Sequence, residues 1–112
     1  MSEDKNYIDF DNALNRIGGN VALYKKLLTI FLSDIKIESL YSAIENNNLE
    51  EVASIAHTIK GVSANLALTD LQSLTTNIDI NAKAGLDCKD FLPELKETYT
   101  NTVELINNYI QE

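Results

Sequence analysis

The chain of 112 residues has few of the residues from which disulfides, metal cages and β-turns are built. It contains one histidine, one cysteine, one proline and four glycines. A lone cysteine permits no disulfide within the chain, which favours a reducing, cytoplasmic compartment. One histidine and one cysteine cannot complete a Cys/His zinc site. Glycine-rich phosphate-binding motifs are missing as well, so we expect neither a bound metal nor a cofactor.

Basic residues and long apolar runs are also scarce. Nine Lys and Arg stand against 17 Asp and Glu, for a net charge of −8. This balance argues against nucleic acid or an anionic membrane as the main partner, because both require a basic face. No run approaches the roughly 18 apolar residues of a membrane span. Residues 1–6 are polar, unlike a secretory signal. We expect a cytoplasmic protein with one domain over residues 1–112.

What the sequence has is helical periodicity. So few glycines and prolines exclude a protein of many strands and turns, and apolar residues recur instead at steps of three and four. Three such series are Tyr24, Leu27, Leu28, Phe31 and Ile35; Val52, Ile55, Ala56, Ile59, Val62, Ser63 and Leu66; and Leu92, Leu95, Tyr99, Val103 and Ile106.

Helix boundaries are marked by glycine and capping residues. We expect a short helix near 9–17, a long helix from Asn20 to beyond Ile44, and further helices over 49–66, after Thr69 and near the C-terminus. The predicted signals are Gly18-Gly19-Asn20, Asn48 with Glu51, Thr69 with Gln72, Gly85 as a C-terminal cap, and Asp87 or Asp90 before Pro93. Short connections make neighbours antiparallel, so the fold class is an all-α, up-down four-helix bundle preceded by a short helix.

The single histidine, His57, is predicted to face solvent. At about 100° per residue it lies roughly 160° from the centre of the apolar arc of its helix. Its neighbours one turn away are mostly small: Ala53, Ser54, Lys60 and Gly61, with Ala64 one turn further. Exposed helix faces usually carry long side chains, so the short side chains around His57 leave its ring unusually accessible.

Gly61 and Lys60 give this surface a possible chemistry. Glycine inside a helix costs about 1 kcal/mol relative to alanine, which points to close approach of another molecule beside His57. A neutral imidazole is a nucleophile, and the Lys60 cation would suit a phosphoryl group placed on it. The alternative is a plain solvated histidine with ordinary surface charge at Lys60.

The motif Ala56-His57-Thr58-Ile59-Lys60-Gly61-Val62-Ser63-Ala64-Asn65-Leu66 resembles the core of histidine-containing phosphotransfer (Hpt) domains. The segment 8–31, with Gly18-Gly19-Asn20, is similar to the N-terminal signature of that family, and the resemblance extends over about 8–84. It implies a four-helix bundle whose His57 accepts a phosphoryl group from a receiver-domain aspartate and passes it to another receiver. The implied protein is a monomeric phosphorelay intermediate, either free-standing or a module of a hybrid sensor kinase.

The resemblance also assigns supporting residues. It implies that Lys60 neutralises the phosphate and that Gly61 provides clearance. Asp79 stands where the family commonly has Glu or Gln, so it either orients the imidazole or is a solvated acid. Ala64 and Ala67 depart from the glycines of many members.

Catalytic groups and Mg²⁺ would come from the receiver. Because nucleotide-binding motifs are absent from the sequence, we expect neither ATP hydrolysis nor autophosphorylation. Docking candidates around His57 are Ala53, Ser54, Ala64 and Asn65, with Ser33 and Lys36 on the long helix. Tyr24, Phe31 and Tyr41 are expected in the core.

Two other classes of function compete with this one. A non-catalytic helical adaptor would bind its partner through a groove, with His57 incidental to binding. A hydrolase or transferase acting alone would need a second polar cluster near His57, for which the sequence offers only Lys60 and Asp79.

Overall fold

The computed structural model describes residues 7–112, and all regular structure within them is helical. Residues 1–6, which carry the prediction that there is no secretory signal, lie outside the described part. No helix among residues 7–112 has the length and apolar character needed to cross a membrane. The elements are α1 (Phe10–Arg16), α2 (Val21–Asp34), α3 (Ile37–Glu45), α4 (Leu49–Leu66), α5 (Thr69–Lys83), the short 3-10 helix η1 (Lys89–Phe91) and α6 (Leu92–Gln111).

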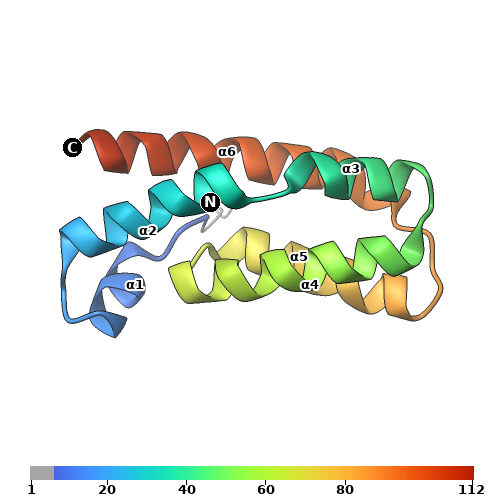
Figure 1. Cartoon of the computed structure of the whole chain (residues 1–112), viewed down its shortest axis with the longest axis horizontal. Helices are drawn as coiled ribbons and strands as arrows, with labels where there is room; N and C mark the ends of the chain where they lie inside the picture. Colours follow the sequence, from blue (N-terminus) through green and yellow to red (C-terminus); the bar gives the residue numbers. More distant parts are fainter. Residues whose placement is uncertain (1–6) are drawn as a thin grey trace, which may run out of the picture.

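The helices form a bundle, as the periodicity predicts. Helices α2 and α3 follow one another along one side, α4 and α5 lie together below them, and α6 runs back along the top (Figure 1). The most extensive packing is between α4 and α5, which a two-residue connection joins. The short helix α1 lies at the end where α2 begins.

The single long helix predicted from Asn20 to beyond Ile44 is wrong, because the chain breaks between α2 and α3. Ile35 is extended, with φ −70° and ψ 138°. A continuous helix would carry the apolar register of Phe31 and Ile35 on to residues 38 and 42, which are exposed. The break changes the register, and the residues buried after it are Ile37, Leu40, Ala43 and Ile44.

Other helix ends agree with the sequence, with two corrections. The Asn20 and Asn48 side chains cap α2 and α4, and Gly85, at φ +81°, follows the end of α5. Thr69 is the first residue of α5 and not its cap; Leu68 occupies the cap position. The Asp87 carboxylate accepts a hydrogen bond of 2.8 Å from the amide of Lys89, the first residue of η1, whose N-cap position is Cys88. Neither Asp87 nor Asp90 caps α6, because Asp90 lies within η1 and Phe91 occupies the N-cap position of α6.

The turn between α4 and α5 contains Ala67, one of the departures from the Hpt pattern. Ala67 ends α4 in the left-handed region, at φ +59°, where glycine is the residue without steric cost. The chain therefore carries a methyl group at a backbone position that favours glycine. That methyl group is buried, as is the neighbouring Leu68, so the turn is part of the core.

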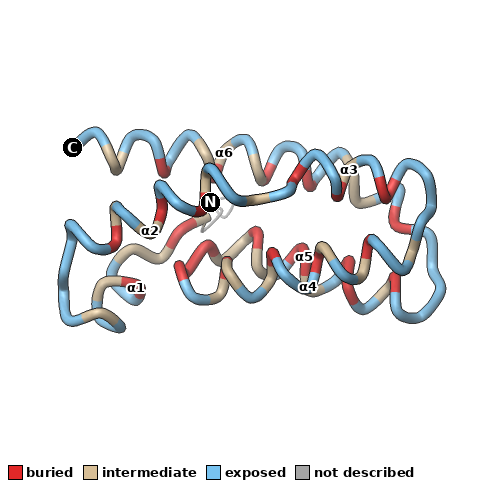
Figure 2. Tube along the Cα trace, viewed as in Figure 1, coloured by how far each residue is buried: buried red, intermediate tan, exposed pale blue. Residues whose placement is uncertain are grey.

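The core lies along the inward faces of all the longer helices (Figure 2). Tyr24 and Phe31 are buried, as expected, while Tyr41 is partly buried with the Lys96 ammonium 5.3 Å from its ring centroid. The Tyr24 hydroxyl donates to the Leu66 carbonyl at 2.8 Å, which fixes the end of α4 against α2. Burial, with nearby Tyr109 and Asp9, raises the pKa of Tyr24 to about 12.

Candidate functional site

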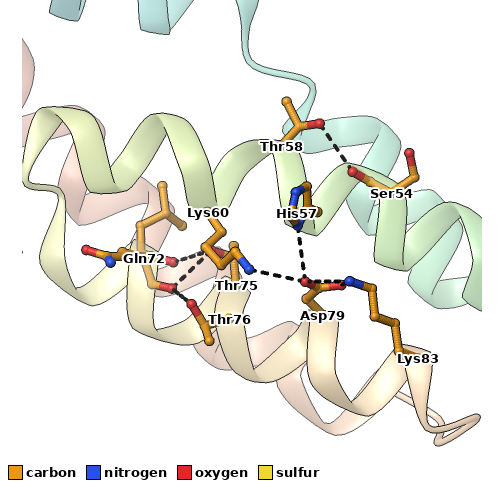
Figure 3. A network of polar contacts seen from close by, with 10 residues as sticks. Ser54, His57, Thr58, Lys60, Gln72, Thr75, Thr76, Asp79 and Lys83 are labelled. Carbon is orange, nitrogen blue, oxygen red and sulfur yellow. Dashed lines mark hydrogen bonds and ion pairs between the residues drawn. The ribbon is translucent and has the colours of Figure 1, made fainter.

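His57 projects from the outer face of α4. The opposite face of this helix is fixed in the core by the buried residues Val52, Ala56, Ile59, Ser63 and Leu66. The His57 side chain is consequently 63% exposed, and its Nδ1 atom lies 3.5 Å from Oδ2 of Asp79 on α5 (Figure 3). The imidazole is thus held at one edge by a carboxylate while the ring remains open to solvent.

Asp79 is a buried acid and not a solvated one. Its side chain is only 4% exposed, because it follows Ile78 and precedes Ala82 on the buried side of α5. Besides His57, two ammonium groups reach it. Nζ of Lys60 on α4 lies 3.4 Å from Oδ2, and Nζ of Lys83 on α5 lies 3.3 Å from Oδ1 and 3.4 Å from Oδ2 (Figure 3). The packing of α4 against α5 brings these four side chains together.

Opposing effects act on the Asp79 carboxyl. Burial alone would raise its pKa, whereas the hydrogen bond and charge of Lys83 lower it, followed by the hydrogen bonds of Lys60 and His57. The cations prevail, and the pKa lies below its ordinary value of 3.8. Asp79 is therefore ionised at neutral pH. The hydrogen bond of Lys83 goes to Oδ2, and Oδ1 receives none within the described residues despite its closeness to the ammonium.

Gly61 lies beside His57 with no structural need for glycine. Beyond its two chain neighbours and the backbone of its own helix, a Cβ atom built on it would meet no atom within 4 Å, and its backbone is not in the left-handed region. Neither packing within the protein nor helix geometry thus accounts for the missing side chain. Of the other small neighbours, Ser54 is exposed, and Ala53 and Ala64 are half-buried. The short side chains of α4 around the imidazole therefore leave the ring accessible.

An apolar groove of about 680 Å³ adjoins this surface between α2 and α4, with α1 at one end. Of the predicted docking residues, Ser54, Asn65 and Lys36 line it, whereas Ala53, Ala64 and Ser33 do not. The Ala64 carbonyl accepts a hydrogen bond of 2.6 Å from Arg16, which joins α1 to the last turn of α4. The apolar lining includes Leu27, Ile30, Phe31, Ile35, Ile55, Ile59 and Val62.

Two features of the site were not predicted from the sequence. Lys83 stands four residues after Asp79 on one helix, a spacing at which opposite charges pair, so this contact could have been found. The groove depends on how α1, α2 and α4 sit relative to one another, and no local pattern encodes that arrangement. Within residues 7–112 no group of three His, Cys, Asp or Glu side chains is placed to hold a metal ion.

The family of the protein follows from comparison with known domains. The Hpt domain matches residues 26–105, which include most of α2, all of α3 to α5 and most of α6. The chain therefore belongs to the Hpt domain family. Searches of curated proteins and of solved structures gave no match. Membership places the protein in two-component phosphotransfer, with receiver domains as its partners.

Proposed function

We propose that this protein is a phosphorelay intermediate whose His57 accepts a phosphoryl group from a receiver aspartate and passes it to the aspartate of another receiver. The observation that carries the proposal is an exposed imidazole whose Nδ1 faces a buried, ionised carboxylate. Such a partner favours the tautomer with hydrogen on Nδ1. Nε2 then keeps its lone pair and points away from Asp79.

The transfer uses this lone pair as the nucleophile. Nε2 attacks the phosphorus of the aspartyl phosphate, the N–P bond forms, and the bond from phosphorus to the carboxylate oxygen breaks. The electron pair of that bond leaves with the receiver aspartate as a carboxylate. Positive charge that develops on the ring is stabilised by Asp79 across its Nδ1–H. Onward transfer is the same step in reverse, with the aspartate of the second receiver as nucleophile.

Lys60 and Gly61 serve the incoming phosphoryl group. Lys60 lies one turn beyond His57, and its ammonium offsets part of the nearly two negative charges that arrive. Gly61 leaves room for the partner to approach the ring, which fits the open space around its missing side chain. Phosphoryl transfer needs positioning and charge neutralisation more than covalent machinery, and the receiver supplies Mg²⁺ and the remaining catalytic groups. We therefore place this protein outside the ATP-using enzymes, as a cytoplasmic monomer.

The receiver docks over His57 and into the apolar groove between α2 and α4. The groove begins beside the histidine, because Ser54 and Thr58, which flank it on α4, line the groove. Its apolar lining suits an amphipathic helix of the receiver. Arg16 at one end of the lining, and Asp34 and Lys36 at the other, supply charges that fix the register of the partner.

The test is phosphoryl transfer from a receiver phosphorylated on its aspartate. We expect the wild-type chain to acquire label that is lost in acid and kept in base, and His57→Gln to acquire none. Lys89→Gln changes an exposed lysine on η1 and should be labelled like the wild type. ATP with Mg²⁺ alone should label none of them. Receiver binding without any label would favour the helical adaptor, and labelling of His57→Gln would place the phosphoryl group on another residue.

A further inference from the structure

Asp79 has one cationic partner more than the proposed transfer uses. Lys60 reaches Oδ2 from α4 and Lys83 reaches both oxygens from α5, so one buried carboxylate is shared by two ammonium groups (Figure 3). The two lysines differ in freedom: the Lys60 side chain is 30% exposed and that of Lys83 is 62% exposed. The proposed chemistry at His57 gives Lys83 no part, yet it contacts the residue that holds the imidazole.

Phosphorylation changes the charge balance around this carboxylate. Before it, two ammonium groups face one carboxylate; afterwards nearly two further negative charges sit on His57. Lys60 must then turn from Asp79 towards the phosphoryl group. A carboxylate that is 4% exposed and loses its cation is strongly destabilised, because burial penalises the unpaired charge. The turn of Lys60 therefore costs less free energy when the Lys83 ammonium stays with Asp79.

We propose that Lys83 is a positioning residue that keeps Asp79 paired while Lys60 leaves for the phosphoryl group. This inference rests on the proposed function of His57. Lys83 does not touch the phosphoryl group; it acts through Asp79 and Lys60. Only ion pairs are exchanged, and the bonds made and broken are those of the transfer itself. Without Lys83, the Lys60 ammonium would have to pair with both the Asp79 carboxylate and the phosphoryl group, and the phosphorylated state would be less stable.

The first experiment measures the equilibrium between phosphohistidine and the phosphoaspartate of a receiver that labels the wild type. Lys83→Gln should shift the ratio away from His57 by about fivefold, the effect of one partly exposed charge pair. Lys83→Arg, which keeps the charge, should restore the wild-type ratio. Lys89→Gln, which removes a similar lysine from its ion pair with Asp87, should leave the ratio unchanged. Equal ratios for Lys83→Gln and Lys89→Gln would overturn the inference.

A double-mutant cycle distinguishes two ways in which Lys83 could act: through the release of Lys60, or by its own electrostatic attraction to the phosphoryl group. In a Lys60→Gln background there is no cation to release, so adding Lys83→Gln should change the ratio less than twofold. A full fivefold effect in that background would show that Lys83 acts directly, and would refute the exchange. Urea unfolding of each variant provides the stability against which the transfer data are compared.

NMR of the lysine ammonium groups tests the exchange without a receiver. After chemical phosphorylation of His57 with potassium phosphoramidate, the Lys60 signal should shift while the Lys83 signal stays near its original position. Movement of Lys83 with Lys60 unchanged would contradict the inference. Exchange seen with phosphoramidate, together with no labelling by any receiver, would instead contradict the proposed function alone, so the two failures can be told apart.

Discussion

Replacing Gly61 with alanine should make the protein more stable and its phosphoryl transfer slower. The substitution adds a methyl group in a helical backbone where no atom lies within 4 Å, apart from the chain neighbours and the backbone of the same helix. Nothing in the protein has to move, so the whole helix-propensity gain of about 1 kcal/mol should appear in the free energy of unfolding. For a domain of this size, that gain corresponds to an increase in Tm of about 4 °C.

Gly85→Ala is the matched control, because the same methyl group is added where φ is +81°. There the left-handed backbone opposes any Cβ, and we expect a loss of about 1 kcal/mol. Both substitutions restrict the unfolded chain equally. The difference between them, about 2 kcal/mol, therefore reports the folded state alone. Urea and thermal unfolding measure both values.

Transfer from a phosphorylated receiver gives the second half of the test. Gly61→Ala should slow labelling of His57 by about tenfold, since small displacements of reacting groups are costly, and Gly61→Gln should slow it further. A Thr100→Gln variant on the exposed side of α6 should transfer at the wild-type rate. Destabilisation by Gly61→Ala would refute the open space around Gly61. Normal transfer by Gly61→Gln would refute its role in clearance.

Two further predictions concern the carboxylate and the groove. Because the folded state lowers the pKa of Asp79, its contribution to the free energy of unfolding is present at neutral pH and is lost as pH falls below about 4. Asp79→Asn should therefore be less stable at pH 7 by about 1–2 kcal/mol and show a shallower acid dependence in urea titrations; an unchanged slope would contradict the ion-pair assignment. Ile30→Glu, in the exposed part of the groove lining, should weaken receiver binding by about tenfold in calorimetry, the effect of a charge facing an apolar partner. Leu105→Glu on α6 is its control, and equal affinities would place docking elsewhere.

The sequence was most informative where local physics decides the structure. Helix α4 begins at Leu49 and ends at Leu66, the bounds that its cap and periodicity predict. The outward position of His57 follows from the same register. These features depend on residues within a few turns of one another, so a single helix contains the whole signal.

The structural features that were missed depend on contacts between helices or on a subtle change of phase. No glycine or proline marks the break at Ile35. The only signal is that the buried apolar positions change helical phase, to Ile37 and Leu40, after the break. The burial of Asp79 could not be decided from Asp79 alone. The available signal for its burial was its position one turn after Thr75 and directly after Ile78, which are both buried on α5. The joint contact of Lys60 and Lys83 with Asp79 required the packing of α4 on α5.

The two-residue turn between α4 and α5 has a consequence for how such a protein diversifies. Every group assigned to the chemistry lies on this one helical hairpin: His57, Lys60 and Gly61 on α4, and Asp79 and Lys83 on α5. One wall of the proposed docking groove instead comes from α2 and the end of α1, while the other wall comes from α4. With the receiver docked as proposed, substitutions on α2 should exchange one signalling partner for another while the reactive hairpin stays intact. The proposed docking mode therefore lets partner choice change through α2 without any change to the residues proposed for phosphoryl transfer.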